Sequence, residues 1–262
     1  MSYLKFTKSA LITGSTSGIA LGIAREFAKT KQYNIVFNGL EVNGQEIADG
    51  IGKEFGIGVM FSNANMLKPE ELRKMVDDAV AKFGKVDVLI NNAGIQHVSP
   101  IEDFPEDKWN AIIAINLTSA FHLTKAVWKG MKERKFGRII NIASAHGLVA
   151  SEFKSAYVAS KHGIVGFTKT IALEGAPFNI NANAICPGYV KTPLVEKQIA
   201  DQAKAHNMSE ADVVNKVMLY KQAVKDFVSL ETLGQTALLL ASDHASTITG
   251  TAIPVDGGWN AQ

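Results

Sequence analysis

The feature of this chain that most constrains its fold is the alternation of short apolar runs, rich in valine and isoleucine, with longer segments of helical period. This alternation is typical of βαβ units, in which helices bury both faces of a parallel sheet. The runs predict seven strands, at residues 10–13, 34–38, 58–62, 86–91, 138–143, 180–185 and 251–256.

The segment between the third and fourth predicted strands carries a clear helical pattern. Pro69 stands at the first helical position, apolar residues recur from Leu72 at i, i+3, i+4, i+7, i+8 and i+11, and Gly84 ends the pattern. No internal repeat, low-complexity tract or Pro/Ser-rich linker divides the chain. We therefore predict a single α/β domain over residues 1–262, of the doubly wound, Rossmann type, with helices on both faces of a parallel seven-stranded sheet.

One stretch departs from the alternation of strands and helices. Residues 191–228 are polar and of helical character, and Ser209 and Asp212 have the spacing of a capping box. The length of this stretch predicts a helical insertion that acts as a lid over the edge of the sheet.

Composition and charge limit the classes of function. The 27 basic and 25 acidic residues leave a net charge of +2, with no block of five like charges, so neither nucleic acid nor a membrane surface is an expected partner. The single cysteine, Cys186, ends an apolar run and is expected to be buried and inert. The N-terminus lacks the apolar run of a signal peptide, and no segment reaches the roughly 18 apolar residues of a membrane span. We expect a cytoplasmic protein that works on a small molecule.

A glycine-rich turn, "TGSTSGIA", follows the first predicted strand and opens a helix. Gly14 and Gly18 bracket this turn, and its backbone N–H groups can approach a pyrophosphate at the positive end of the helix. Ala20 stands where a third glycine is expected, so the helix must pack around one methyl group. The predicted contacts from this turn are Gly14, Thr16, Ser17, Gly18 and Ile19.

The ends of the next three strands extend the predicted dinucleotide site. Residues 38–41 offer no Arg or Lys for a 2′-phosphate, which favours NAD over NADP. Asn65 is expected near the adenine, and Asn92, Ala93 and Gly94 of "NNAG" near a ribose. Each of these residues taken singly also fits an ordinary loop.

Tyr157 and Lys161 lie at i and i+4 on one predicted helix. An ammonium beside the phenol favours the phenolate and can lower the pKa of the tyrosine from about 10 toward working pH. A tyrosine with such a pKa can take a proton from an alcohol. The spacing alone is weak evidence, because lysine is a frequent residue in this chain.

Six motifs together strengthen this evidence. "TGSTSGIA", "NNAG", Asn116 in "IAINL", Ser144, "YVASK" and "PGYVKTP" occur in this order, each near the carboxyl end of a predicted strand. Over almost its whole length the chain resembles the short-chain dehydrogenase/reductase family, apart from Ala20 in place of glycine and Asn65 in place of aspartate.

The resemblance implies a role for each residue of the site. Ser144 would polarise the substrate oxygen, Tyr157 would exchange its proton, Lys161 would also hold the nicotinamide ribose, and Asn116 would support a proton-relay water. Hydride would pass between the substrate carbon and NAD. The last motif adds Pro187, Gly188, Val190 and Thr192 to the cofactor contacts. A metal ligand set is not expected.

Five further residues narrow the substrate: Gln96, His146, Lys154, Gln198 and Trp259. They offer one cation, several neutral donors and an aromatic wall, which suit a small carboxylate beside a secondary alcohol. Taken singly, each also has an ordinary surface or core role. As a set they resemble, position by position, the members of the family that act on D-3-hydroxybutyrate. The expected substrate pair is 3-hydroxybutyrate and acetoacetate.

Two other classes of function stay open at this stage. The first is a 3-oxoacyl thioester reductase of the same family, which usually uses NADPH, although the cofactor turns here lack the cation that role needs. The second is a catalytically silent NAD-binding regulator or scaffold, against which the joint presence of Ser144, Tyr157 and Lys161 counts. Relatives in this family are usually tetramers, and apolar-faced helices over about 105–133 and 154–175 could form such an interface, although core packing predicts the same pattern.

Overall fold

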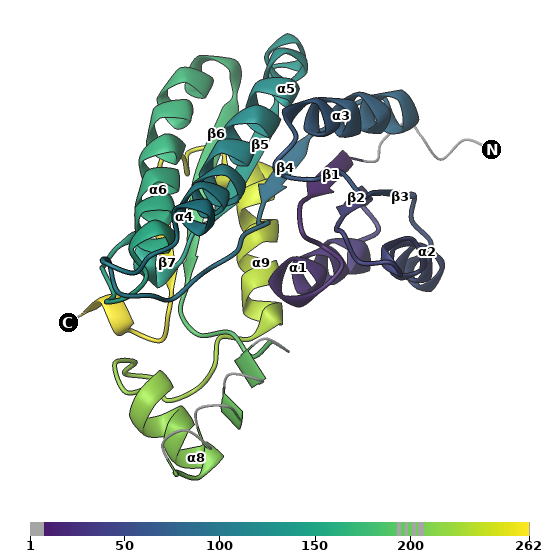
Figure 1. Ribbon diagram of the computed structural model, residues 1–262. Helices are drawn as coiled ribbons and strands as arrows, with labels where there is room; N and C mark the ends of the chain where they lie inside the picture. The colour runs from purple at the N-terminus through teal and green to yellow at the C-terminus, as the bar shows by residue number, and fades with distance from the viewer. Residues whose placement is uncertain (1–7, 193–194, 197–198, 201–202, 204–206, 262) are drawn as a thin grey trace.

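A parallel sheet of seven strands forms the centre of the molecule (Figure 1). The computed structural model describes residues 8–192, 195–196, 199–200, 203 and 207–261. The strands are β1 (Lys8–Ile12), β2 (Tyr33–Asn38), β3 (Val59–Ser62), β4 (Val88–Asn91), β5 (Gly137–Ile142), β6 (Ile180–Pro187) and β7 (Ala252–Val255). Their order is β3-β2-β1-β4-β5-β6-β7, and every neighbouring pair is parallel. All seven strands lie where the sequence predicts them, with their ends displaced by no more than two residues.

Helices cover both faces of the sheet, as the fold class predicts (Figure 1). One layer contains α1 (Gly18–Lys29), α2 (Gly44–Phe55) and α9 (Leu230–Ala241), and the other contains α3 (Pro69–Phe83), α5 (Ser119–Arg134) and α6 (Ser155–Gly175). Side chains alternate along each strand, so Ile12 and Ile90 join the first core while Leu11 and Leu89 join the second. Helix α3 has the bounds that Pro69 and Gly84 predict.

The predicted helix over about 105–133 forms one continuous helical run, but the run changes from α-helix to π-helix and back. It consists of α4 (Glu106–Ile113), a π-helical segment (Ala114–Thr118) and α5. The run Glu106–Arg134 is long and apolar enough to qualify as a candidate membrane span, which the sequence analysis did not expect. Its side chains Leu123 and Met131 are buried in the core against the sheet, so this run behaves as a core helix of the domain.

The insertion at residues 191–228 contains α8 (Glu210–Asp212) and a π-helical segment (Val213–Met218) among its described residues. Ser209 accepts from the backbone N–H of Asp212, which confirms the predicted cap. The insertion has a small core of its own, in which Val213, Met218 and Leu219 are buried. Figure 1 shows α8 standing apart from the two helical layers.

Four short 3₁₀ segments complete the described elements: Ala145–Gly147, Ala176–Phe178, Asp243–Ala245 and Trp259–Ala261. The first and last of them lie at the carboxyl ends of β5 and β7. Cys186 is fully buried in β6, and burial raises the pKa of its thiol to about 11. The burial that the sequence predicts for this residue is confirmed, and the raised thiol pKa disfavours the reactive thiolate.

Candidate active site

A cleft of about 840 Å³ opens at the carboxyl ends of β1, β2, β4, β5 and β6. The strand order reverses between β1 and β4, and ligands of such sheets bind where this reversal leaves a crevice. The predicted residues that line it are Gly14, Ser17, Gly18, Ile19, Asn65, Asn92, Ala93, Gly94, Gln96, Ser144, His146, Lys154, Tyr157, Lys161, Pro187, Gly188, Val190, Thr192 and Trp259. Segments far apart in the sequence thus meet at one edge of the sheet.

The glycine turn is built for close approach. Gly14 has φ +63, and a Cβ there would lie 3.2 Å from Asn92 Nδ2 and 3.2 Å from the Cα of Ala93. The hydroxyl of Thr13 accepts from the N–H groups of Asn92 and Ala93 at 2.9 and 3.0 Å, so this turn and "NNAG" are held together.

The helix that follows the turn has the chemistry of an anion site. Ser17 is the N-cap of α1 but makes no capping bond, and the first turn of the helix contains no acidic residue. Its first N–H groups are thus left for a ligand. These residues fit the pyrophosphate of a dinucleotide.

Two of the residues predicted to contact the cofactor, Thr16 and Ile19, differ in whether they line the cleft. Ile19 lines the cleft, whereas Thr16 is buried and does not. The hydroxyl of Thr16 donates instead to the carboxylate of Glu41, which also accepts from the Ser17 hydroxyl at 3.3 Å. Burial raises the pKa of Glu41, but the hydrogen bonds from Thr16, from the backbone and from Ser17 together outweigh it and hold the pKa below its ordinary value. An anion therefore faces the glycine turn, and Glu41 is a cleft residue that the sequence analysis did not single out.

Asn65 lies in the cleft, but its side chain is partly committed. Its Oδ1 accepts from the backbone N–H of Leu67 at 2.9 Å, which closes a local turn. An amide oxygen has a second lone pair, so Asn65 keeps the capacity to accept from a ligand amino group.

Ser144, Tyr157 and Lys161 meet in the middle of the cleft. The buried Lys161 ammonium donates to the carbonyl of Ile142 at 2.8 Å and lies 5.6 Å from the centroid of the Tyr157 ring. Burial lowers the pKa of Lys161 to about 8.

The expected lowering of the Tyr157 pKa by Lys161 is not found in the protein alone. Burial raises the pKa of Tyr157 above its ordinary value, and the hydrogen bond with Ser144 opposes this rise. The Tyr157 side chain is half-buried in the cleft, and the Lys161 ammonium donates to a backbone carbonyl. Tyr157 therefore carries its proton before any ligand binds.

Asn116 lies in the π-helical segment and is buried beneath the cleft rather than lining it. Its Oδ1 accepts from Ile95 N–H at 2.8 Å, and its Nδ2 donates to Ile95 O at 2.9 Å and to Ser160 Oγ at 3.2 Å. The side chain thus fixes the loop that follows Gly94. The proton-relay water expected at this residue stays a prediction.

Aromatic rings form one wall of the cleft. Trp259 stacks on Tyr189 with ring centroids 5.6 Å apart and an interplanar angle of 24°, and His146 meets Trp259 edge-on at 5.3 Å. Tyr189 is a second cleft residue that the sequence analysis missed, although it lies inside the quoted motif "PGYVKTP". Its role depends on a ring contact that spacing in the sequence cannot reveal.

His146 and Lys154 bring polarity to this wall. Burial, followed by the charges of Lys154 and Lys221, lowers the pKa of His146 to about 4, so the ring is neutral. His146 Nδ1 is buried and has no hydrogen-bond partner among the residues that the structure describes. Burial also lowers the pKa of Lys154. Among the residues that the structure describes, the Lys154 side chain has no ion pair or hydrogen bond, so a half-buried cation faces the cleft unmatched.

The remaining predicted residues differ in status. Gln96 is exposed at the mouth of the cleft. Gln198 lies outside the described residues. Within the described part of the chain, no group of three or more His, Cys, Asp or Glu side chains could hold a metal ion.

Comparisons with known proteins agree with this geometry. The family described as short chain dehydrogenase matches residues 8–203. D-beta-hydroxybutyrate dehydrogenase of Rhizobium meliloti (strain 1021) is 52% identical over 258 residues, covering 98% of this chain and 100% of that protein. The protein of the same name from Cupriavidus necator is 50% identical over 255 residues, covering 97% and 98%. A solved variant of actinorhodin polyketide ketoreductase with NADPH has a TM-score of 0.91 at 31% identity and covers 98% of each chain.

Proposed function

Because this chain belongs to the short chain dehydrogenase family, whose members are oxidoreductases with a nicotinamide cofactor, we propose that it interconverts D-3-hydroxybutyrate and acetoacetate with NAD. The chain shares about half of its residues, over nearly its full length, with two proteins named for that substrate. We take residues 1–262 as one catalytic domain, with residues 191–228 as its lid.

One observation carries the choice of substrate. Lys154 is a half-buried cation without a partner among the described residues, on the wall that also holds neutral His146 and Trp259. A desolvated cation is stabilised by an anion, and a small carboxylate can accept from Lys154 and from the N–H of a neutral histidine. Gln96, and Gln198 by resemblance, would add neutral donors. The Trp259 face is left for the short alkyl chain.

The residues in the middle of the cleft account for the chemistry. When bound, the nicotinamide supplies the acceptor or donor of the hydride. Tyr157, protonated in the protein alone, is ready to donate a proton to the keto oxygen of acetoacetate. In the oxidative direction Tyr157 must first lose that proton to solvent, and the Lys161 ammonium, 5.6 Å from the ring centroid, would favour the phenolate only once ligands are bound, since no such effect is present in the protein alone. Ser144, in hydrogen-bond contact with Tyr157, would polarise the same substrate oxygen.

The preference for NAD rests on Glu41 as well as on missing cations. Its carboxylate faces the glycine turn through Thr16 and Ser17. Such an anion can accept from a ribose 2′-hydroxyl and would repel a 2′-phosphate. This feature disfavours the alternative of an NADPH-dependent 3-oxoacyl reductase. The complete set of Ser144, Tyr157 and Lys161 in one cleft disfavours a silent regulator.

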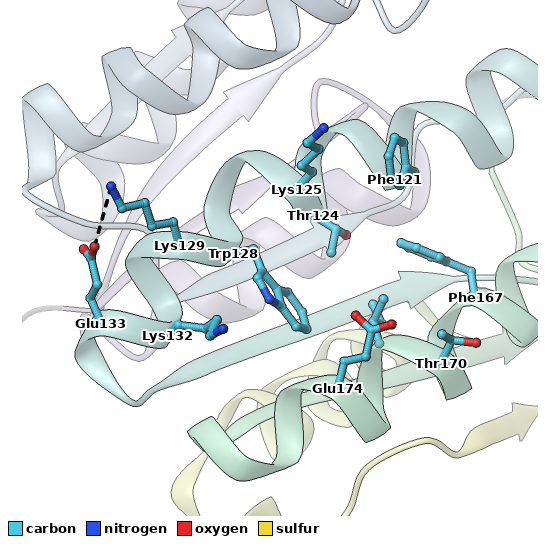
Figure 2. A pocket seen from close by; sticks show the side chains of 11 residues that line it. Phe121, Thr124, Lys125, Trp128, Lys129, Lys132, Glu133, Phe167, Thr170 and Glu174 are labelled. Carbon is cyan, nitrogen blue, oxygen red and sulfur yellow. Dashed lines mark ion pairs between the residues drawn. The ribbon is translucent and has the colours of Figure 1, made fainter.

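A homotetramer and a cytoplasmic location belong to the same proposal. A groove of about 560 Å³ between α5 and α6 is lined by the rings of Phe121, Trp128 and Phe167, and Phe121 is 45% exposed (Figure 2). Its lining includes three lysines and the carboxylates of Glu133 and Glu174, and the presence of both charges suits a self-complementary contact with a second copy. Light scattering of the purified chain tests the tetramer. A free buried cysteine suits a reducing compartment.

The test of the function is an assay of NADH formation. The purified chain is supplied with NAD and with D- or L-3-hydroxybutyrate, longer D-3-hydroxy acids and a 3-hydroxyacyl thioester. We expect turnover on D-3-hydroxybutyrate to exceed turnover on the L-isomer and on the thioester. Higher efficiency on the thioester with NADP would overturn the proposal.

A further inference from the structure

Gln222 lies in the segment that ends the insertion, and it differs from its neighbours there. Residues 223–226 are exposed, whereas Gln222 is 1% exposed. A buried amide must find hydrogen-bond partners or destabilise the fold. The partners of this side chain therefore indicate what it does.

The amide of Gln222 joins two separate segments. Its Nε2 donates to the carbonyls of Val224 at 3.2 Å and Asp226 at 2.9 Å, which holds the end of the insertion in a tight curve. Its Oε1 accepts at 3.4 Å from the backbone N–H of Tyr189, two residues after the end of β6. The two segments are joined again where Val228 N–H donates to Tyr189 O at 2.9 Å.

A third segment packs against the same side chain. Gly257 has φ +63, and a Cβ at this position would lie 2.8 Å from Gln222 Nε2, so only glycine fits there. The N–H of Val224 donates to Gly257 O at 2.9 Å. Gln222 is thus enclosed by the end of the insertion, the Tyr189 segment and the turn that leads to Trp259.

Two of these segments carry the aromatic wall of the cleft. Tyr189 and Trp259 stack at 5.6 Å, and Trp259 in turn contacts His146. Gln222 does not line the cleft. The hydrogen bonds of its Oε1 and Nε2, and its packing against Gly257, nevertheless set the separation of the Tyr189 and Trp259 segments, which do line it.

We propose that Gln222 is a positioning residue that couples the end of the insertion to the Tyr189–Trp259 wall, and so sets the affinity for the hydroxy acid without contacting it. The proposal rests on the proposed function insofar as it concerns 3-hydroxybutyrate. Because the pyrophosphate and adenine end of the cleft lies at β1 and β2, away from Gln222, removing the coupling weakens substrate binding more than cofactor binding.

The chemistry of the amide supplies a specific test. Gln222→Glu keeps the shape of the side chain. A protonated carboxyl has one O–H donor for Asp226 O and one carbonyl acceptor for Tyr189 N–H, whereas the ionised form can donate nothing and faces two carbonyls. Gln222→Met removes both functions and cannot titrate. Burial raises the pKa of the introduced carboxyl, which brings its titration toward the range of the assay.

The measurement is KM for D-3-hydroxybutyrate as a function of pH, taken as the ratio of variant to wild type. For Gln222→Glu we expect a ratio of about 2 at low pH that climbs to about 10 or more as the carboxyl ionises. For Gln222→Met the ratio should be raised at every pH, and the affinity for NADH should stay within about twofold of wild type in both variants. The matched control is Gln235→Met in α9, whose amide bonds to Glu26 away from the cleft; its KM should not change.

A second readout does not need the reaction. In a background with Trp109 and Trp128 replaced by Phe, Trp259 is the fluorescent reporter of the wall, and Gln222→Met should increase its quenching by acrylamide. In the unsubstituted chain, hydrogen exchange should show the Tyr189 and Val224 amides protected. A pH-independent KM ratio for Gln222→Glu, unchanged quenching of Trp259, or fast exchange of both amides would each overturn the proposal. An enzyme inactive on 3-hydroxybutyrate would overturn the proposed function instead, since quenching and exchange still report on Gln222.

Discussion

Replacing Lys154 by alanine tests the substrate assignment most directly. Two lysines, Lys154 and Lys161, are among the described residues that line the cleft, and the ammonium of Lys161 already donates to Ile142 O at 2.8 Å. Lys154 has no such partner among the described residues, and burial lowers its pKa, which marks an ammonium that lacks a counter-charge. His146 cannot replace it, because a pKa of about 4 leaves that ring neutral.

The expected loss of kcat/KM in Lys154→Ala follows from the lack, in the described lining of the cleft, of another cation that could bind the substrate carboxylate. A hydrogen bond to a charged group contributes about 1.5–3 kcal/mol, and a carboxylate left unpaired in a partly desolvated pocket adds to the loss. We therefore expect Lys154→Ala to lower kcat/KM for D-3-hydroxybutyrate by about 2–4 kcal/mol, roughly 30- to 1000-fold. An exposed lysine would give almost no effect.

The assay is NADH formation from the acid, and NADH consumption with either acetoacetate or its methyl ester, 3-oxobutyrate methyl ester. Lys154→Ala should lose efficiency on both acids and little on the uncharged ester. The matched control is Lys169→Ala, which removes an exposed lysine of α6, the helix whose N-cap is Lys154; this variant should behave as wild type. Equal loss on acid and ester would refute the carboxylate role and indicate that Lys154 supports the Tyr157 helix.

Three other predictions concern the proton, the cofactor and acid stability. Tyr157→Phe should abolish measurable turnover while titration of NADH fluorescence shows nearly unchanged binding; near-normal turnover would contradict its role. The kcat/KM with NAD should exceed that with NADP by at least about tenfold. Both Leu40→Arg and Glu41→Gln should lower this ratio. Equal kcat/KM with the two cofactors in wild type would contradict the role of Glu41 in cofactor choice. His146 has a folded pKa of about 4 against 6.5 unfolded, so the unfolded state binds more protons between these values. The free energy of unfolding, which His146 does not reduce above pH 6.5, should therefore fall by about 3 kcal/mol as the pH drops to 4. Urea unfolding at a series of pH values should show a smaller fall for His146→Gln than for wild type.

The fold was predictable because its signals are local. Valine- and isoleucine-rich runs identify buried parallel strands, and Pro69 and Gly84 set the ends of α3 through their fixed and left-handed backbone angles. The π-helical segment at residues 114–118 was not predictable, since its widened turn serves contacts of Asn116 with Ile95 and Ser160 that are distant in sequence.

The sequence predicted which residues form the site better than it predicted their pKa values. The motifs place Ser144, Tyr157 and Lys161 at one sheet edge, and the structure brings them together. The direction of the Tyr157 pKa shift was wrong, because burial of the phenol is a property of the packed molecule. Thr16 was expected in the cleft, but its hydroxyl is turned to Glu41.

The sequence by itself determined which backbone segments meet, because periodicity, caps and glycine turns act over a few residues and a parallel sheet gathers the carboxyl ends of its strands at one edge. The tertiary structure alone decided what the side chains at that edge do. Lys154 is left without a described counter-charge, Glu41 faces the glycine turn, and Gln222 holds Tyr189 near Trp259. Burial, pKa and ring stacking depend on atoms far apart in the chain, and no spacing in the sequence records those distances.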